Sequence, residues 1–300
     1  MHAEGSVRID SRRHARLAFL RQKQWWSFER LDPERKLYFV LLALKGLPTS
    51  YVSLKAIDYE HDVRWEEDHL GSFHAAPGDA VNVTAEGKWG HLRFQGQADS
   101  GWQIEAQTPN LQLQCEQRCQ APVHTNRFLT RHIDYTITQF PMNTAQGNMQ
   151  LKGQAIPFQG YGYCEHNWGV QPRHSCANWL HFWTPDTAGI VLDCHYDAGV
   201  PHHYTYLWHG GQWQYLFSPA QFFFVPEKIG QPWQIKSPDL DLIATPVYYH
   251  HTRMRMPPFF SYIDIDYYES LVNVEGKVTT KGNEIAIKGI GKFDHNFNLW

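Results

Sequence analysis

The densest group of polar and aromatic side chains in the sequence is the segment from Gly160 to Gly169, which reads GYGYCEHNWG. On an extended strand, successive side chains point to opposite faces, so Glu165 would lie on one face and His166 with Trp168 on the other. Imidazole is the usual general acid or base near neutral pH, and an adjacent indole ring excludes water and stabilises a developing cation. The segment therefore predicts proton transfer in an apolar setting. The alternative is a buried strand whose polar side chains only satisfy backbone groups.

The segments that follow are also rich in aromatic and ionisable side chains. As strands, they would place Trp179, His181 and Trp183 on one face, and Asp193 with His195 on one face of the next strand. If Asp193 is buried on its mainly apolar strand, it could donate a proton or orient a histidine; the alternative is an ordinary exposed carboxylate. The candidate catalytic residues are His166, Trp168, Glu165 and Asp193. The candidate substrate-binding residues are Tyr163, Trp179, His181, Trp183, His195, Tyr204 and Tyr206.

Several common catalytic and cofactor motifs are missing from the sequence. It contains 18 His, but no H-E-x-x-H and no paired C-x2-C, which are the usual zinc spacings. The neighbours His202 and His203 would point to opposite faces of a strand, as would His250 and His251, so neither pair could chelate an ion. Glycine-rich nucleotide loops and the G-x-S-x-G nucleophile motif are also missing. We therefore expect neither a metal nor another cofactor.

Composition and charge exclude further classes of protein. The 300 residues include 27 Lys and Arg against 30 Asp and Glu, and this balance argues against nucleic-acid binding. The longest apolar run has eight residues, whereas a membrane-spanning helix needs about 20. The N-terminus lacks the apolar stretch of a secretory signal, and five cysteines make a poor disulfide framework, so we expect a cytoplasmic protein with reduced thiols. Residues 1–23 form a basic arm with a short expected helix over 12–24. It is either a solvated leader or a peripheral contact with a membrane surface.

Apolar residues recur with a period of two along most of the remaining chain. Trp102, Ile104 and Ala106 alternate with polar neighbours, and the segments around residues 111–115 and 272–276 show the same pattern. Such alternation indicates strands with one face in a core and the other in water. Turn-forming residues separate these segments at short intervals. The sequence therefore predicts an all-β protein of antiparallel strands, arranged as a barrel or a sandwich.

Two internal echoes predict a duplicated architecture. The segment QWWSF from Gln24 recurs in related form as NWLHF from Asn178, and GYCEHNW from Gly162 recurs as GKFDHNF from Gly291. Each half thus opens with an aromatic strand and closes with a glycine, an acid, His-Asn and an aromatic residue. We predict two homologous modules, residues 24–170 and 171–300, after the arm of residues 1–23. Barrels of about eight strands can enclose one small ligand.

The segment Gly162–Gly169 resembles the Gly-x-x-[Asp/Glu]-His-x-Trp-Gly motif of the hydroxyneurosporene synthase (carotenoid hydratase) family. The resemblance covers about residues 24–300 and implies two lipocalin-like (calycin-type) antiparallel β modules in tandem. Some members add water across a carotenoid double bond, and similar proteins are cyclases, including Diels–Alder catalysts; none needs a redox cofactor. Carried onto this sequence, the family's catalytic residues are His166, Trp168 and Asp193. The family's Tyr-x-Asp pattern has Val191 in place of its tyrosine, so a hydroxyl that would position water is missing.

Three hypotheses of function follow. The first is a cofactor-independent enzyme, a hydratase or a cyclase or isomerase, acting on a lipophilic unsaturated small molecule. Asp193 or His166 would protonate a double bond, and Trp168, Trp179 and Trp183 would shelter the cationic character that develops. The second hypothesis is a carrier of a lipophilic ligand without catalysis. The third is a structural protein whose aromatic strands are all core.

Overall fold

The computed structural model describes residues 22–46, 50–75, 80–97, 100–130, 133–196, 200–225, 228–256 and 263–299. These residues are almost entirely strands and tight turns, and no α-helix occurs among them. Up to position 21, the predicted N-terminal arm lies outside the described residues. The predicted helix over residues 12–24 is wrong at its C-terminal end, because Gln22–Gln24 belong to the first strand. Within the described part of the chain, no helix has the length and apolar character needed to span a membrane.

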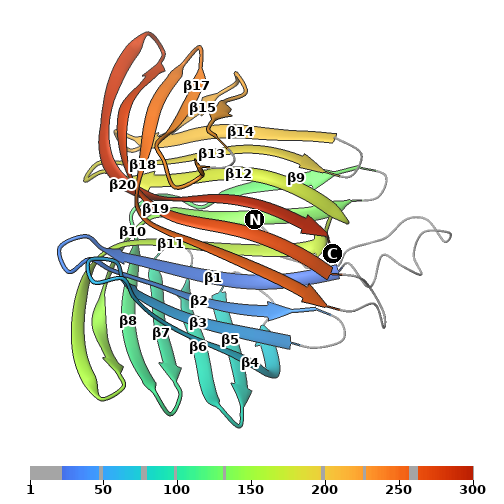
Figure 1. Ribbon diagram of the computed structural model, residues 1–300, viewed down its shortest axis with the longest axis vertical. Helices are drawn as coiled ribbons and strands as arrows, with labels where there is room; N and C mark the ends of the chain where they lie inside the picture. The colour runs from blue at the N-terminus through green and yellow to red at the C-terminus, as the bar shows by residue number, and fades with distance from the viewer. Residues whose placement is uncertain are drawn as a thin grey trace, which may run out of the picture. The chain divides into compact units, whose positions relative to one another are not determined.

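The chain divides into two compact units, Met1–Gln171 and Pro172–Trp300, called unit 1 and unit 2 below. Unit 1 contains eleven strands, drawn from blue to yellow-green in Figure 1. They are β1 (Gln22–Asp32), β2 (Leu37–Lys45), β3 (Ser50–Asp58), β4 (Val63–Ala75), β5 (Ala80–Gly87), β6 (Gly90–Gln97), β7 (Gly101–Gln107), β8 (Leu111–Cys119), β9 (His124–Leu129), β10 (Asp134–Leu151) and β11 (Gln154–Val170).

The strands of unit 1 close into a barrel. They pair antiparallel in the order β11-β1-β2-β3-β4-β5-β6-β7-β8-β10, and a further pairing of β10 with β11 completes a ring of ten strands, with β9 added along β10. The predicted alternation places Trp102 and Ile104 of β7 inside this ring, each 2% exposed, while their polar neighbours face outward. The core is aromatic: the ring of Phe28 lies 4.0 Å from that of Phe94 and 5.7 Å from that of Trp102. Burial of this inner face stabilises the sheet. The pairing of β10 with β11 removes the free edges of the ring.

One charged side chain lies within this apolar interior. Arg30 is 1% exposed, and its Nη1 atom donates to the backbone carbonyls of Glu29 and Tyr163. Its guanidinium lies 5.5 Å from the ring centre of Phe28. No carboxylate among the described residues forms an ion pair with it, and its Nε and Nη2 atoms are buried without a hydrogen-bond partner there. A buried charge without an opposite charge lowers the stability of the folded state.

Replacement of this cation by an apolar side chain of similar length is expected to stabilise unit 1. Arg30→Met should raise the free energy of unfolding by about 1–4 kcal/mol, because the cost of burying the charge is removed while the volume is kept. Denaturant unfolding of the variant and the wild type would measure the difference. Arg118→Met, at an exposed arginine of the same unit, should change nothing measurable. A variant at position 30 that unfolds at lower denaturant concentration would contradict the expectation.

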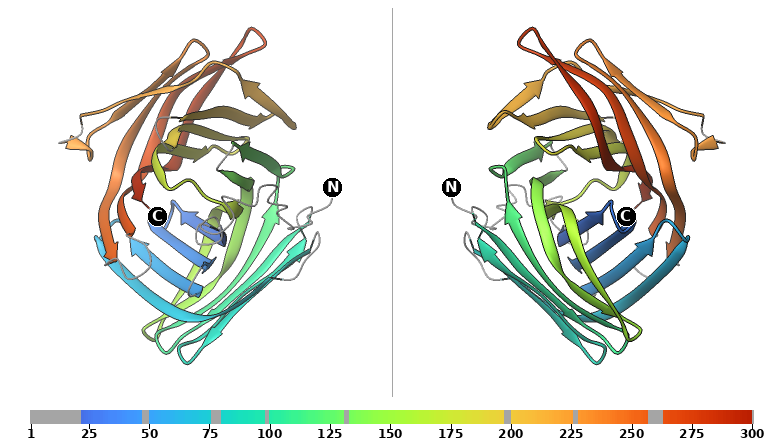
Figure 2. Two further views of the ribbon diagram at one scale, coloured as in Figure 1. Left: turned by 90° about the vertical axis from the view of Figure 1, so that its right-hand side faces the viewer. Right: turned by 90° about the vertical axis from the view of Figure 1, so that its left-hand side faces the viewer.

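Unit 2 contains nine strands in one open antiparallel sheet, drawn from yellow to red in Figure 1 and as long curved ribbons in Figure 2. The strands are β12 (His174–Trp183), β13 (Thr187–Tyr196), β14 (Val200–His209), β15 (Gln212–Leu216), β16 (Gln221–Phe223), β17 (Trp233–Ser237), β18 (Leu240–Met256), β19 (Ile263–Thr280) and β20 (Asn283–Leu299). Their order in the sheet is β15-β14-β13-β12-β20-β19-β18-β17-β16. The core lies on one face, where Trp233 stacks on Phe224 at 3.5 Å and contacts Phe293.

The structure supports the internal repeat that the sequence echoes suggest. The closing strands β11 and β20 have 17 residues each, and their burial patterns agree at the first eleven positions. Each follows a two-residue turn with positive φ, Lys152-Gly153 (51° and 84°) in unit 1 and Lys281-Gly282 (51° and 81°) in unit 2. Such turns match the twist of the strands they join. The fold is therefore all-β with two lipocalin-like modules, as predicted, one a ten-stranded barrel and the other an open curved sheet.

Candidate active site

The predicted Glu-His-Asn-Trp strand lies in unit 1 as β11, with its side chains on the two expected faces. His166 lies between two indole rings: its ring centre is 4.0 Å from that of Trp26 and 4.6 Å from that of Trp168. Trp26 comes from β1, where it is the direct partner of His166 in the sheet. The side-chain amide of Gln24 donates to Nε2 of His166 at 3.0 Å. Because an amide NH2 can only donate, this nitrogen must act as an acceptor.

The environment of His166 determines its protonation state. Burial between the rings lowers the pKa of His166 to about 3. The imidazole is therefore neutral at physiological pH and accepts a proton poorly. The lowered pKa argues against His166 as a protonated imidazolium that donates a proton, the role considered from the sequence. The neutral ring can still form hydrogen bonds.

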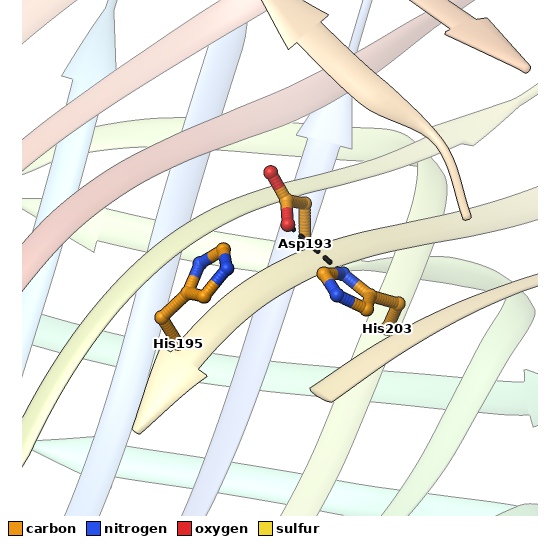
Figure 3. A group of neighbouring side chains, drawn as sticks. All are labelled: Asp193, His195 and His203. Carbon is orange, nitrogen blue, oxygen red and sulfur yellow. Dashed lines mark ion pairs between the residues drawn. The ribbon is translucent and has the colours of Figure 1, made fainter. Parts of the chain in front are cut away.

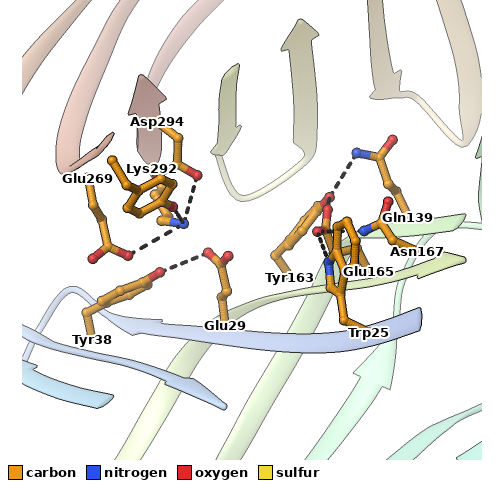
Figure 4. Close-up of polar contacts among 11 residues, drawn as sticks. Trp25, Glu29, Tyr38, Gln139, Tyr163, Glu165, Asn167, Glu269, Lys292 and Asp294 are labelled. Carbon is orange, nitrogen blue, oxygen red and sulfur yellow. Dashed lines mark hydrogen bonds and ion pairs between the residues drawn. The ribbon is translucent and has the colours of Figure 1, made fainter. Parts of the chain in front are cut away.

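The other face of β11 carries a carboxylate with three donors. Glu165 accepts hydrogen bonds from Trp25 Nε1 at 3.1 Å, from the Tyr163 hydroxyl at 2.9 Å and from Asn167 Nδ2 at 2.8 Å (Figure 4). Gln139 Nε2 in turn donates to the Tyr163 hydroxyl at 2.9 Å. Three converging donors are the pattern expected for an ionised carboxylate. Glu165 is therefore held in one orientation, as a positioned acceptor.

A second tyrosine–carboxylate pair belongs to the same unit. The hydroxyl of Tyr38 on β2 donates to Glu29 Oε2 on β1 at 2.9 Å (Figure 4). Glu29 is 4% exposed and Tyr38 is 1% exposed. Glu29 is thus withdrawn from water, whereas Glu165 is partly exposed.

Unit 2 carries a buried cation between two carboxylates, called the Lys292 cluster below. Glu269 of β19 and Asp294 of β20 are direct partners in the sheet, and like charges in that position repel each other. Lys292 Nζ relieves the repulsion by donating to Asp294 Oδ2 at 2.9 Å and lying 3.5 Å from Glu269 Oε1 (Figure 4). It also donates to the hydroxyl of Tyr267 at 3.1 Å. Lys292, Glu269 and Asp294 have side chains exposed by 6% or less, so the cluster is a buried group of ionisable side chains.

The predicted aromatic residues of β12 lie on the same face of the sheet as this cluster. Trp179 is the direct partner of Asp294, and His181 is the direct partner of Lys292. The ring of Trp179 lies 5.6 Å from Lys292 Nζ. His181 packs edge-on against Trp179 and Trp183, with ring centres 4.4 and 4.7 Å away. Burial, with a smaller contribution from the positive charge of Lys292, holds the pKa of His181 well below its usual value, so this ring is neutral.

Asp193 and His195 occupy the opposite face of the unit 2 sheet. Tyr204 and Tyr206 of β14 are sheet partners of Leu192 and Ile190, and therefore share the face of Trp179 rather than that of Asp193. Asp193 is partly exposed and lies beside His203, a residue the sequence did not single out (Figure 3). The structure therefore separates the predicted residues into three groups: those of β11 in unit 1, the rings of unit 2 that share the sheet face of Lys292, and the pair Asp193 and His195 on the other face.

None of the predicted residues lines either of two hollows on unit 1. The larger, of about 690 Å³, is bordered by polar side chains including Arg93, Gln103 and Glu116. The other, of about 440 Å³, lies beside Arg118 and Tyr161. Their linings mix polar and apolar side chains and lack the predicted aromatic residues, so neither is the ring-lined space expected for a lipophilic substrate.

The Lys292 cluster was not identified from the sequence, although the repeat contained a signal. The second echo aligns GKFDHNF from Gly291 with GYCEHNW from Gly162. This alignment places Asp294 at the position of Glu165, and Lys292 at that of Tyr163. Treating the two segments as equivalent would have nominated Asp294 with Glu165. Glu269 and Tyr267 carry no comparable signal, because only the pairing of β19 with β20 brings them to Lys292.

The fold and these buried clusters define an all-β protein of two lipocalin-like modules, each with ionisable groups on its closing strand. No protein-family model matches the chain, and no curated protein matches it by sequence.

Solved structures resemble it over most of its length. A protein of Nitrosomonas europaea given the name AttH has a TM-score of 0.60 at 13% identity, covering 91% of this chain and 92% of that chain. Kievitone hydratase from Nectria haematococca has a TM-score of 0.62 at 10% identity, covering 92% and 88%. CghA with Sch210972 has a TM-score of 0.69 at 10% identity, covering 93% and 88%. At these identities the likeness confirms the fold that the motif resemblance implied.

Proposed function

We propose that the protein is an enzyme that adds water to, isomerises or cyclises a lipophilic, unsaturated small molecule by acid–base chemistry, without a redox cofactor. The observation that carries the proposal is the Lys292 cluster: a buried ammonium, two carboxylates and a phenol beside indole rings. Support comes from the fold, which is shared with a hydratase and with a protein that binds a small molecule.

Tyr267 is the proton donor in this proposal. Its hydroxyl oxygen accepts a hydrogen bond from the Lys292 ammonium, a contact that stabilises the phenolate left when the proton is donated. Tyr267 is only partly buried, whereas Lys292 and its carboxylates are buried, so the phenol is the member of the cluster that a substrate can reach. Glu269 and Asp294 hold the ammonium in place. Such a positioned acid contributes about 10²–10⁴-fold to a rate.

The aromatic residues of β12 suit the cationic character that protonation of a double bond creates. The ring face of Trp179 already lies near a cation, Lys292, and such faces attract positive charge. The neutral ring of His181 can accept a hydrogen bond from water that attacks the cation, and the proton that this water loses returns to the Tyr267 phenolate.

The test is a comparison of Tyr267→Phe with wild type. Small molecules extracted from the purified protein are returned to each variant, with kievitone and neurosporene as additional defined probes. Conversion is followed by mass spectrometry. We expect wild type to transform a probe and Tyr267→Phe to do so about a hundredfold more slowly or worse, with unchanged binding. Tyr215→Phe, at an exposed tyrosine of β15, serves as the matched control and should retain full activity.

Two outcomes contradict the proposal. Full activity in Tyr267→Phe would reject this phenol as the acid. A bound ligand that wild type returns unchanged after long incubation would instead establish a carrier.

A further inference from the structure

The face of the unit 2 sheet away from Lys292 carries a second group of ionisable side chains. Asp193 and His195 are two residues apart on β13, so both point to this face. His203 on β14 is the direct sheet partner of Asp193 and points the same way. The carboxylate oxygens and imidazole nitrogens that these three residues offer all lie within 4.8 Å of one another (Figure 3).

The contacts within this group leave an unsatisfied atom. His203 Nδ1 lies 2.9 Å from Asp193 Oδ1, which is a hydrogen-bonding distance. The oxygen is nevertheless out of line with the ring nitrogen, and Nδ1 is shielded from solvent with no hydrogen-bond partner among the described residues. The rings of His195 and His203 lie 5.6 Å apart, at 80° to each other. His203 Nδ1 and the Asp193 carboxylate are thus in ion-pair contact without a well-formed hydrogen bond, and a shielded polar atom in that state usually costs free energy.

A divalent transition-metal ion would satisfy all three groups. Zinc takes histidine nitrogens at about 2.0–2.1 Å and carboxylate oxygens at about 2.0–2.2 Å, so its ligand atoms lie roughly 3–3.5 Å from one another. The observed separations reach that range if side chains move by about an ångström. Two imidazoles and one carboxylate are a common ligand set of such ions, with a coordination position left open.

We propose that Asp193, His195 and His203 bind one divalent ion of the zinc class. The ion is held across β13 and β14, with His195 at its exposed side as the route of entry. Sequence spacing did not predict this site, because one ligand comes from the neighbouring strand and only the register places it opposite Asp193. The proposal is independent of the proposed function, since the Lys292 cluster lies on the other face of the sheet.

The test uses the full chain after treatment with a chelator. Zn²⁺ is added alone, and bound metal is measured by equilibrium dialysis and elemental analysis. Co²⁺ is added in a parallel experiment for its visible spectrum. We expect one equivalent of Zn²⁺ per chain and a raised thermal midpoint on binding. Asp193→Asn, His195→Ala and His203→Ala should each weaken binding at least tenfold.

His202→Ala provides the matched control. His202 is adjacent to His203 but lies on the opposite face, where its Nδ1 is 3.1 Å from the Tyr196 hydroxyl. The His202→Ala variant should bind Zn²⁺ as tightly as wild type. The proposal is overturned if wild type binds less than one equivalent, or if the three ligand variants bind as tightly as it does. A sulfur-to-cobalt charge-transfer band would also overturn it, because Cys176, the sheet partner of His195, would then be a ligand.

Discussion

Acidification from pH 7 to pH 5 is expected to remove about 6 kcal/mol from the free energy of unfolding, about 2 kcal/mol for each of His166, His124 and His202. Burial lowers the pKa of His166 to about 3 and those of His124 and His202 to about 4. The pKa of His181 is held well below its usual value, and that of His295 is also lowered. In the unfolded chain these histidines return to about 6.5.

The sign of this effect follows from proton uptake. Between the folded and unfolded pKa values, the unfolded state binds more protons, so stability is complete above about pH 6.5 and is lost as pH falls. Each histidine that stays neutral in the folded state contributes about 1.4 kcal/mol per pH unit in that window. A loss of this size is a large share of the typical stability of a domain.

Denaturant unfolding at pH 7, 6 and 5 measures the effect. His166→Gln removes one titrating ring and should reduce the slope of stability against pH by about one proton's contribution, about 1.4 kcal/mol per unit. His74→Asn, at an exposed histidine of β4, should leave the slope unchanged. Stability that is equal at pH 7 and pH 5 would contradict the expectation.

Removal of the Lys292 charge alone is expected to destabilise unit 2 by about 3–5 kcal/mol. Lys292→Met leaves Glu269 and Asp294 as opposed, buried carboxylates with no cation between them. A variant that also carries Glu269→Gln and Asp294→Asn should recover most of the loss, because no net charge is then left buried.

Denaturant unfolding of the single and triple variants separates the contribution of charge pairing in the Lys292 cluster from that of side-chain packing. Lys277→Met provides the control on the same strand as Glu269: its ammonium lies 2.7 Å from Glu284, but both side chains are more than half exposed. It should have no measurable effect, since exposed ion pairs contribute little. A triple variant less stable than Lys292→Met would contradict the account of the cluster.

The sequence predicted the local structure well where alternation is regular. Trp102, Ile104 and Ala106 are buried in β7 as expected, because side chains of period two must face one core. The echoed segments predicted two β modules, and the motif resemblance implied the lipocalin-like fold that the structure shows. The number of strands in the barrel could not be predicted, because closure depends on the pairing of β10 with β11 and leaves no local pattern.

The chemical state of the predicted residues depended on partners distant in the sequence. His166 is neutral because Trp26, supplied by β1, covers it. Lys292 resembles an exposed strand lysine in the sequence, yet its position opposite His181 and beside Glu269 makes it the centre of a buried cluster. The opposite faces of Asp193 and Trp179 follow from the register of β12 with β13, which the sequence alone did not fix.

Solvent-isotope labelling tests the central claim most directly, since acid–base chemistry must move a proton between solvent and substrate carbon. The ligand extracted from the purified protein is incubated in D2O with wild type and with Tyr267→Phe, and the products are analysed by mass spectrometry. The account predicts a wild-type product with deuterium bound to carbon, formed about a hundredfold more slowly by the variant. A wild-type protein that returns the ligand chemically unchanged and without deuterium would contradict it.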